Sequence, residues 1–355
     1  MDQRYQALSH WVAQVLQQDK VELSVVSGDA SFRRYFRYSA NGKSWIAMDA
    51  PPQKEDSTGF IKIAREWFGQ GIRVPEIIAL DLQQGFLLLS DFGDRLLLGA
   101  LNPQEPDRVN GDKYYHKAMR ILCRIQSLDS ESAKLPLYDS KLLQTEMALF
   151  KNWLLDAKLG LKLSDKQAAD LQACFDFLEQ RALAQTQVVV HRDYHARNLM
   201  ICDDDELGVL DFQDAVIGAA TYDLVSLLRD CYIVWPDQAV EHWCRVFYEL
   251  SQSTETAIAL PSSFEAFKED FDLMGLQRHI KVAGIFCRLS IRDGKHGYLK
   301  DIPRTLDYIL RVAHSLIDRD AQRFSSLLPL VQMIEQEVYS RVLAPSFTNV
   351  PGAGV

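Results

Sequence analysis

The residues of this chain best suited to chemistry are two carboxylates and an amide. Residues 191–198 read His-Arg-Asp-Tyr-His-Ala-Arg-Asn, and Asp211 follows thirteen positions after Asn198. Phosphoryl transfer needs one carboxylate at the attacking hydroxyl and oxygen ligands that hold magnesium across the phosphates. The spacing predicts that Asp193 is the catalytic base and that Asn198 and Asp211 are magnesium ligands.

Short apolar runs flank both parts of this pattern. Residues 188–190 are three valines before the first part, and residues 207–210 read Leu-Gly-Val-Leu before Asp211. Apolar runs of this length between polar residues predict small buried strands. Such strands would present the catalytic residues at their ends.

Composition limits the classes of protein that remain. The 355 residues are 47% hydrophobic and 25% charged, which is typical of globular proteins, and the net charge of −9 argues against nucleic acid or an anionic membrane as partner. No apolar stretch reaches the length of a membrane span, and residues 1–20 predict an amphipathic helix rather than a signal peptide. Six scattered cysteines without a C-x-x-C pair indicate reduced thiols in a cytoplasmic protein.

The first ninety residues predict a small sheet crossed by one helix. Asn41-Gly42 is a strong hairpin signal, and Gly71 follows a helical pattern as its stop. The predicted strands are residues 23–26, 32–38, 44–48, 77–80 and 85–89, and the predicted helix is residues 58–70.

Helical patterns dominate after Leu96. The predicted helices are residues 113–128, 140–157, 165–184, 222–232, 238–251, 264–293, 304–317 and 323–342. We therefore predict an α+β protein with a β-rich N-terminal nucleotide-binding lobe (1–91) and a helical catalytic and substrate-binding lobe (92–342). A Pro- and Gly-rich tail (343–355) should pack little from residue 345 onward.

The loop at residues 191–199 resembles that of the aminoglycoside phosphotransferase-like kinases, which also place a histidine two residues after the catalytic aspartate. The order of the lobes is similar over residues 5–340. The resemblance implies a bilobal protein-kinase-like fold and a small-molecule kinase that uses ATP and Mg²⁺. It also implies that His191 and Asp223 support the loop structurally.

Further segments resemble the anomeric kinases of N-acetylmuramate and N-acetylglucosamine. They are residues 28–37, 48–52, 228–232, 277–281, 284–286, 292–295 and 298–299. This resemblance implies phosphorylation of the sugar C1 hydroxyl in peptidoglycan recycling, with a small-molecule sugar as the partner. Two alternatives remain: a kinase for an aminoglycoside, choline or another amine, and a nucleotide-binding pseudokinase.

The nucleotide site departs from the protein-kinase pattern, because the strand at residues 45–49 has no lysine and the turn before it has one glycine. Backbone amides of the turn would then hold the phosphates. The residues of this turn are Gly28, Asp29, Ala30 and Ser31. The missing cation would be Arg33, Arg34, Arg37 or Lys54.

Other candidate site residues lie on both sides of the catalytic loop. Residues 90–94 spell D-F-G but precede the loop, so Asp91 is assigned to the nucleotide side and not to a metal. Glu66 lies where the kinase ion-pair glutamate would be, and a surface role is the alternative. The candidates for sugar contacts are His195, Arg197, Arg229 and Arg292, with Arg288 and Lys295 as further cations. The sequence leaves the anomer, the phosphate-binding cation and the oligomeric state open.

Overall fold

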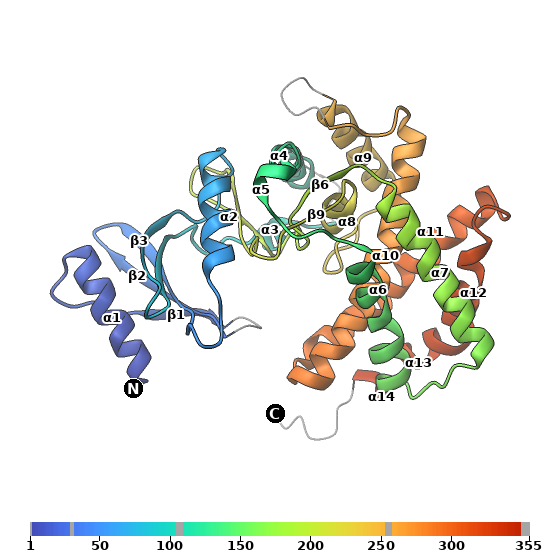
Figure 1. Ribbon diagram of the computed structural model, residues 1–355, viewed down its shortest axis with the longest axis horizontal. Coiled ribbons are helices and arrows are strands. Elements are labelled where there is room, and N and C mark those ends of the chain that lie inside the picture. The colour runs from blue at the N-terminus through green and yellow to red at the C-terminus, as the bar shows by residue number, and fades with distance from the viewer. Residues whose placement is uncertain (1, 29–31, 104–108, 253–257, 349–355) are drawn as a thin grey trace. The chain divides into compact units, whose positions relative to one another are not determined.

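The computed structural model describes residues 2–28, 32–103, 109–252 and 258–348, which form two compact units (Figure 1). The first unit comprises Met1–Asn102, Asp107–Ile121 and Ala196–Asp214. The second comprises Pro103–Pro106, Leu122–His195 and Ala215–Val355. The lobe predicted over residues 1–91 thus lies within the first unit, which also takes in part of the catalytic segment.

The first unit is built on a five-stranded antiparallel sheet of order β1-β2-β3-β5-β4. Its strands are β1 (Ser24–Gly28), β2 (Arg34–Ala40), β3 (Lys43–Asp49), β4 (Ile77–Asp81) and β5 (Phe86–Ser90). The predicted hairpin between β2 and β3 is confirmed, since Asn41 and Gly42 have φ of 53° and 73°. Left-handed conformations at both central residues are what a tight hairpin turn requires.

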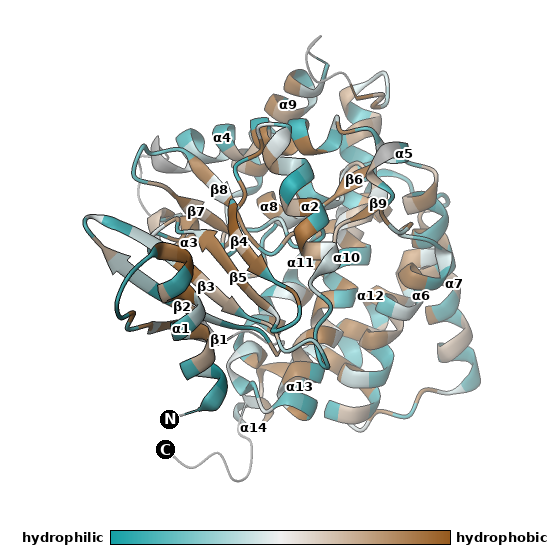
Figure 2. Cartoon of the chain, turned by 60° about the vertical axis from the view of Figure 1, so that its left-hand side comes forward, coloured by the Kyte–Doolittle hydropathy of each residue, from teal (hydrophilic) through white to brown (hydrophobic). Residues whose placement is uncertain are grey.

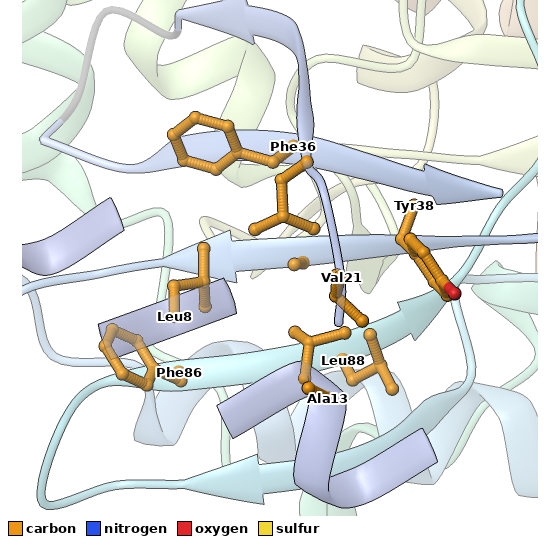
Figure 3. Packing of buried hydrophobic residues seen from close by; sticks show 10 residues of the cluster. Leu8, Ala13, Val21, Phe36, Tyr38, Phe86 and Leu88 are labelled. Carbon is orange, nitrogen blue, oxygen red and sulfur yellow. The ribbon is translucent and has the colours of Figure 1, made fainter. Parts of the chain in front are cut away.

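Two helices pack with this sheet, α1 (Gln3–Leu16) and α2 (Thr58–Gly69). The predicted N-terminal helix is confirmed as α1, whose Leu8 and Val12 are fully buried against Phe36, Phe86 and Leu88 of the strands (Figure 3). Burying each such side chain contributes about 1.5–3 kcal/mol. The central strands β3 and β5 are correspondingly hydrophobic in Figure 2.

A buried carboxylate ties α1 to the sheet. Asp49, at the end of β3, has no exposed surface, and it accepts hydrogen bonds from Arg4 Nε and Arg34 Nε at 3.0 Å each. The two guanidinium groups satisfy the buried charge from a helix and from a strand. Arg34 therefore has a structural role, as a partner of the buried Asp49 carboxylate.

The rest of the first unit carries the metal-ligand part of the predicted site. It contains α3 (Leu97–Ala100), the N-terminal part of α4 (Val109–Gln126), and a hairpin of β7 (Leu199–Ile201) and β8 (Leu207–Val209). The predicted strand before Asp211 is confirmed as β8. The amides of Ile201 and Val209 donate to the carbonyls of Arg95 and Arg73 at 2.7 and 2.8 Å, which anchors the hairpin.

The second unit is mainly helical, as predicted. Its elements include α5 (Ser130–Ala133), α6 (Ser140–Leu149), η1 (Phe150–Lys158), α7 (Asp165–Leu183), β6 (Gln187–Val190), β9 (Val216–Ala219), α8 (Tyr222–Leu228), α9 (Asp237–Ser251) and α10 (Phe264–Asp293). They continue with η2 (His296–Asp301), α11 (Ile302–Arg319), η3 (Ser325–Leu327), α12 (Leu328–Met333), η4 (Ile334–Val338), α13 (Tyr339–Leu343) and α14 (Pro345–Thr348). No helix in the described part of the chain is long and apolar enough to cross a membrane.

Helix α10 is the centre of the second unit. It contacts α6, η1, α7, α8, α9, α11 and η2, and nearly all its residues from Phe271 to Gly284 are buried. Its predicted bounds are confirmed. Because partners surround it, charged residues in its middle must find their counter-charges inside the protein.

The prediction that residues after 345 pack little is wrong for the first of them. Residues 345–348 form α14, where Phe347 is buried beneath Lys158, whose Nζ lies 5.0 Å from the ring centre. One apolar side chain is enough to dock a short terminal helix on an apolar site. Residues 349–355 lie outside the described part of the chain.

Gly284 sets the distance between α10 and the junction of α6 and η1. A Cβ atom at this position would lie 2.3 Å from the carbonyl carbon of Leu149. We expect Gly284→Ala to lower the free energy of unfolding by about 1–3 kcal/mol, since backbone must move apart to admit the methyl group.

Gly275 of the same helix is the matched control. There the nearest atom to an added Cβ is the flexible Arg229 Nη1 at 3.2 Å. Gly275→Ala should change stability less, because the end of a side chain moves more easily than backbone. The gain of up to about 1 kcal/mol for alanine over glycine in a helix can then offset the cost. Chemical denaturation measures both variants, and equal destabilisation would contradict the close approach at Gly284.

Candidate active site

The catalytic-loop segment is shared by the two units. Residues up to His195 belong to the second unit, and residues from Ala196 belong to the first. The predicted base and the predicted metal ligands therefore have different local surroundings. Each half of the site has its own supports.

The first unit contains a cavity of about 480 Å³, within the range of small-molecule sites. Apolar side chains of the sheet, of α2 and of the β7–β8 region provide much of its wall. They are Val26, Tyr35, Ile46, Phe60, Leu89, Met200, Leu210 and Phe212. Polar groups line the rest: Arg37, residues 90–94, Arg197, Asn198, Asp211 and Gln213.

Asn198 and Asp211, the predicted metal ligands, line this cavity together. Asn198 Nδ2 lies 3.4 Å from Asp211 Oδ2, and the Leu210 amide donates to the Asn198 carbonyl at 2.9 Å. Gln213 Nε2 donates to Asp211 Oδ1 at 2.7 Å. The β7–β8 hairpin thus brings Asn198 and Asp211 together, although thirteen positions separate them in the chain.

Asp211 has φ of +63°, a left-handed conformation that costs energy for a residue other than glycine. Its neighbour Phe212 is fully buried, with its ring centre 5.0 Å from Phe60 and 5.7 Å from Trp67, both on α2. This packing holds the backbone in place. The carboxylate is thereby presented toward the cavity.

The ligand set fits magnesium rather than a metal held entirely by protein. Among the described residues, no group of three or more His, Cys, Asp or Glu side chains is placed to hold a metal ion. Magnesium commonly takes one or two protein oxygens and completes its octahedron with phosphate oxygens and water. Asn198 and Asp211 suit this arrangement.

Asp91 lines the cavity, but its carboxylate is occupied within the protein. Arg37 donates to it from Nε at 2.6 Å and from Nη2 at 3.1 Å, and the Gly93 amide donates at 2.9 Å. Arg37 Nη1 also donates to Asp94 at 2.6 Å. These bonds shape the turn at residues 91–94, which are among the residues that line the cavity.

The four candidates for the missing cation have other partners. Arg33 lies 3.5 Å from Glu55, Arg34 is committed to Asp49, and Lys54 Nζ lies 4.6 Å from the centre of the Phe32 ring. Only Arg37 of the four is among the residues that line the cavity. The cation beside Asn198 in that lining is Arg197, which the sequence assigned to the sugar.

Two other predictions for the nucleotide side, Glu66 and the turn at residues 28–31, are not supported by contacts at the cavity. Glu66 lies on α2 beside Lys62 and Arg65, and it is not among the residues that line the cavity. Gly28 ends β1, while Asp29, Ala30 and Ser31 lie outside the described residues. Glu66 and this turn remain predictions from the sequence.

In the second unit, Asp223 braces the start of the catalytic loop. Its carboxylate accepts from the backbone amides of His191 at 2.6 Å and of Arg192 at 2.9 Å. His191 is fully buried, and its Nδ1 accepts from the Asp193 amide at 3.2 Å. These contacts have the geometry of structural support for both His191 and Asp223.

Arg192 is strained in the same way as Asp211, with φ of +77°. Its side chain is held by the buried Glu146 of α6 at 2.5 Å, and the same carboxylate binds Lys281 Nζ of α10 at 2.9 Å. Lys281 also donates to the Tyr222 hydroxyl at 2.8 Å, and the Tyr138 hydroxyl binds Glu146. A network from three helices thus fixes the residue before the predicted base.

Asp193 lies in an electrostatic field that favours its ionised form. Burial raises the pKa of its carboxyl, but Lys281, His195 and Arg278 outweigh burial and hold the pKa below its ordinary value. A carboxylate that stays ionised can accept the proton of a hydroxyl group or orient that hydroxyl. Sequence reasoning missed Lys281, Glu146 and Arg278 as site residues.

A signal for these residues was present in the chain. Gln277, Arg278, His279 and Lys281 are polar or charged but lie in the middle of a helix flanked by apolar segments. Charges at such positions indicate buried pairs or a functional site. Their partners, however, lie on other elements.

The predicted sugar contacts are dispersed. His195 lies in the loop, its ring centre 5.4 Å from that of Tyr232, and its buried Nδ1 has no hydrogen-bond partner within the described part of the chain. Arg229 is buried, and its Nη2 donates to Asp272 at 2.6 Å. Arg292 is exposed and pairs with the adjacent Asp293 at 2.7 Å. His195 is among the main contributors to the field at Asp193.

Asp223 should control the acid side of the pH profile. Burial raises the pKa of its carboxyl to about 6, partly opposed by His191. The ionised carboxylate accepts both loop amides, whereas protonation removes one acceptor, so kcat should fall as pH falls through about 6. Asp223→Asn should lower kcat and abolish this limb.

Stability should follow the opposite trend over this window. Because folding raises the pKa of Asp223 from its ordinary 3.8, its contribution to the free energy of unfolding is present below about pH 4 and is lost as pH rises through 6. Measurements of kcat and of the free energy of unfolding against pH, for the wild type and for Asp223→Asn, test both expectations. An acid limb near pH 6 that persists in Asp223→Asn would assign it to another group.

Comparison with known proteins agrees with this geometry. Residues 22–252 match the model of the phosphotransferase enzyme family. The chain is 41% identical over 318 residues to an N-acetylmuramate/N-acetylglucosamine kinase of Pseudomonas aeruginosa, covering 87% of this chain and 91% of that protein. A kinase of the same name from Neisseria meningitidis is 36% identical over 352 residues, covering 98% and 99%.

The fold is also found among solved structures. An ethanolamine kinase of Plasmodium vivax superimposes with a TM-score of 0.61 at 12% identity, covering 86% of each chain. At this identity the likeness concerns the fold alone. The predicted α+β, protein-kinase-like fold class and the resemblance to the sugar kinases are confirmed.

Proposed function

This chain belongs to the phosphotransferase enzyme family and is a phosphotransferase, and we propose that it transfers the γ-phosphate of ATP to an amino sugar. The acceptor is the anomeric C1 hydroxyl of N-acetylmuramate or N-acetylglucosamine, and Mg²⁺ is required. The observation that carries the proposal is Asp193, kept ionised in a braced loop whose chain continues to Asn198. Peptidoglycan-sugar recycling in the cytoplasm is part of this proposal.

The nucleotide half is supported by the cavity of the first unit. Its apolar walls suit a flat base, and residues 91–94 line part of the same cavity. Asn198 and Asp211 would hold magnesium, which supplies charge neutralisation for the phosphates. The strained but anchored Asp211 would meet the ion with little rearrangement.

The acceptor half is supported by Asp193 and its surroundings. An anomeric hydroxyl is more acidic than an ordinary alcohol, so Asp193 would mainly orient its oxygen toward the γ-phosphate. A positioned base contributes about 10²- to 10⁴-fold in rate. The cations Lys281 and Arg278 near Asp193 argue against a cationic acceptor such as choline.

Arg197 takes the place of the missing strand lysine in this proposal. It lines the same cavity as Asn198 and Asp211 and is the direct neighbour of Asn198 in the chain. The Arg37 guanidinium in that lining holds the turn at residues 91–94 through Asp91 and Asp94. A guanidinium there would bind phosphate oxygens through charged hydrogen bonds. Sugar recognition would then fall to the second unit.

Arg197→Met should raise KM for ATP about tenfold with little effect on KM for the sugar, as expected for one charged hydrogen bond. The control is Arg73→Met, which removes a half-exposed arginine of the same unit that pairs with Asp204 at 2.7 Å. Steady-state kinetics with each substrate varied gives both constants. A rise confined to the sugar KM would return Arg197 to the acceptor side.

The acceptor is tested by ADP release with magnesium-ATP across amino sugars, aminoglycosides and choline. We expect turnover of the two N-acetylated sugars, and of neither without Mg²⁺. Asp193→Asn should lower kcat by about 10²- to 10⁴-fold while ATP affinity stays nearly unchanged. Asp203→Asn, at an exposed position, is the matched control.

Other outcomes of these assays would support the alternative functions. Turnover of only the amine substrates would support an amine kinase. ATP binding without any turnover would support a pseudokinase. Equal loss of ATP affinity and rate in Asp193→Asn would show that Asp193 serves the nucleotide rather than the acceptor.

A further inference from the structure

A row of basic residues follows one face of α10. Arg278, Lys281, Ile285, Arg288 and Arg292 are separated by 3, 4, 3 and 4 positions, which places all five on one side of the helix. Arg278 and Lys281 both act electrostatically on Asp193. The row therefore starts near the predicted base and extends along the helix for about 20 Å.

The cations of this row differ in their counter-charges. Lys281 binds Glu146 at 2.9 Å, and Arg292 pairs with Asp293 at 2.7 Å. Arg278 has no ion pair among the described residues, but it donates to Cys231 Sγ at 3.7 Å and lies in the field of Asp193 and Asp230. Its charge is thus balanced at longer range.

Arg288 is the cation whose charge is least balanced. It is half-buried, it has no ion pair with any residue of the described ranges, and its Nε is buried without an acceptor. Burial and the neighbouring Arg292 lower its pKa, although Asp293 and Glu146 oppose them. A guanidinium held in this way lacks an anion, and desolvating it without one is costly.

Aromatic side chains lie beside this face. Phe286 stacks on Tyr298 at 5.3 Å between ring centres and lies 6.2 Å from Tyr232, which in turn contacts His195. Ile285, in the middle of the row, is half-exposed. Phe286 is buried, whereas Tyr232, Tyr298 and Ile285 are partly exposed, and such aromatic and aliphatic surface beside a basic row suits a ligand with apolar C–H faces and one negative charge.

We propose that Arg288 binds the carboxylate of an acidic acceptor sugar and so distinguishes it from a neutral one. This inference rests on the proposed function. N-Acetylmuramate carries a lactyl carboxylate where N-acetylglucosamine has a hydroxyl, and a guanidinium can bind a carboxylate through two parallel hydrogen bonds. The reacting C1 hydroxyl lies at Asp193, and the carboxylate lies farther along α10.

The test compares the two sugars in Arg288→Met. KM for N-acetylmuramate should rise about ten- to hundredfold, as expected for a lost charged hydrogen bond, and KM for N-acetylglucosamine should change less than about threefold. Arg288→Lys should recover part of the loss, because it keeps the charge. Arg311→Met is the control, since it removes a more exposed arginine of the same unit that pairs with Asp237 at 3.2 Å.

Retained turnover of N-acetylglucosamine shows that the variant is folded. Equal changes for both sugars, or no change for N-acetylmuramate, would overturn the role of Arg288. An equal effect in Arg311→Met would assign the preference to net charge. Wild-type protein that phosphorylates neither sugar would overturn the proposed function itself, which is a separate result.

Discussion

The loop that carries the proposed base Asp193 depends on buried carboxylates behind it. Asp223 accepts the amides of His191 and Arg192, and Glu146 holds the Arg192 side chain together with Lys281. Removing one partner of a buried pair of this kind costs about 3–5 kcal/mol, because an unpaired charge stays behind. The loop is thus held from α6, α8 and α10 before any ligand binds.

Both strained residues of the site are restrained by their neighbours. Arg192 and Asp211 adopt left-handed conformations, which for residues other than glycine persist only where the surroundings over-determine them. Arg192 is held by charge, and Asp211 is held by the packing of Phe212 on α2. In each case the restraint lies next to a residue proposed to act in the reaction, so its geometry is prepared in advance.

The charge of the whole chain says little about the charge of its site. The net charge is −9, yet α10 directs four basic side chains along one face, starting near Asp193. The net charge describes the chain as a whole, whereas this local row suits an anionic small molecule. Arg37 shows the converse, since a cation in a suitable cavity is already neutralised by two aspartates.

The sequence by itself determined the parts that depend on near neighbours. Periodicity located α1, α2 and α10, the Asn41-Gly42 turn set the β2–β3 register, and the segment at residues 191–199 pointed to the family. Only the tertiary structure decided which charges meet. Glu146 pairs with Lys281 across 135 positions of the chain, and Arg197 rather than Arg33 lines the cavity of the first unit. Local patterns encode which face of a helix is buried, but the partner of a buried charge is chosen by how distant helices pack.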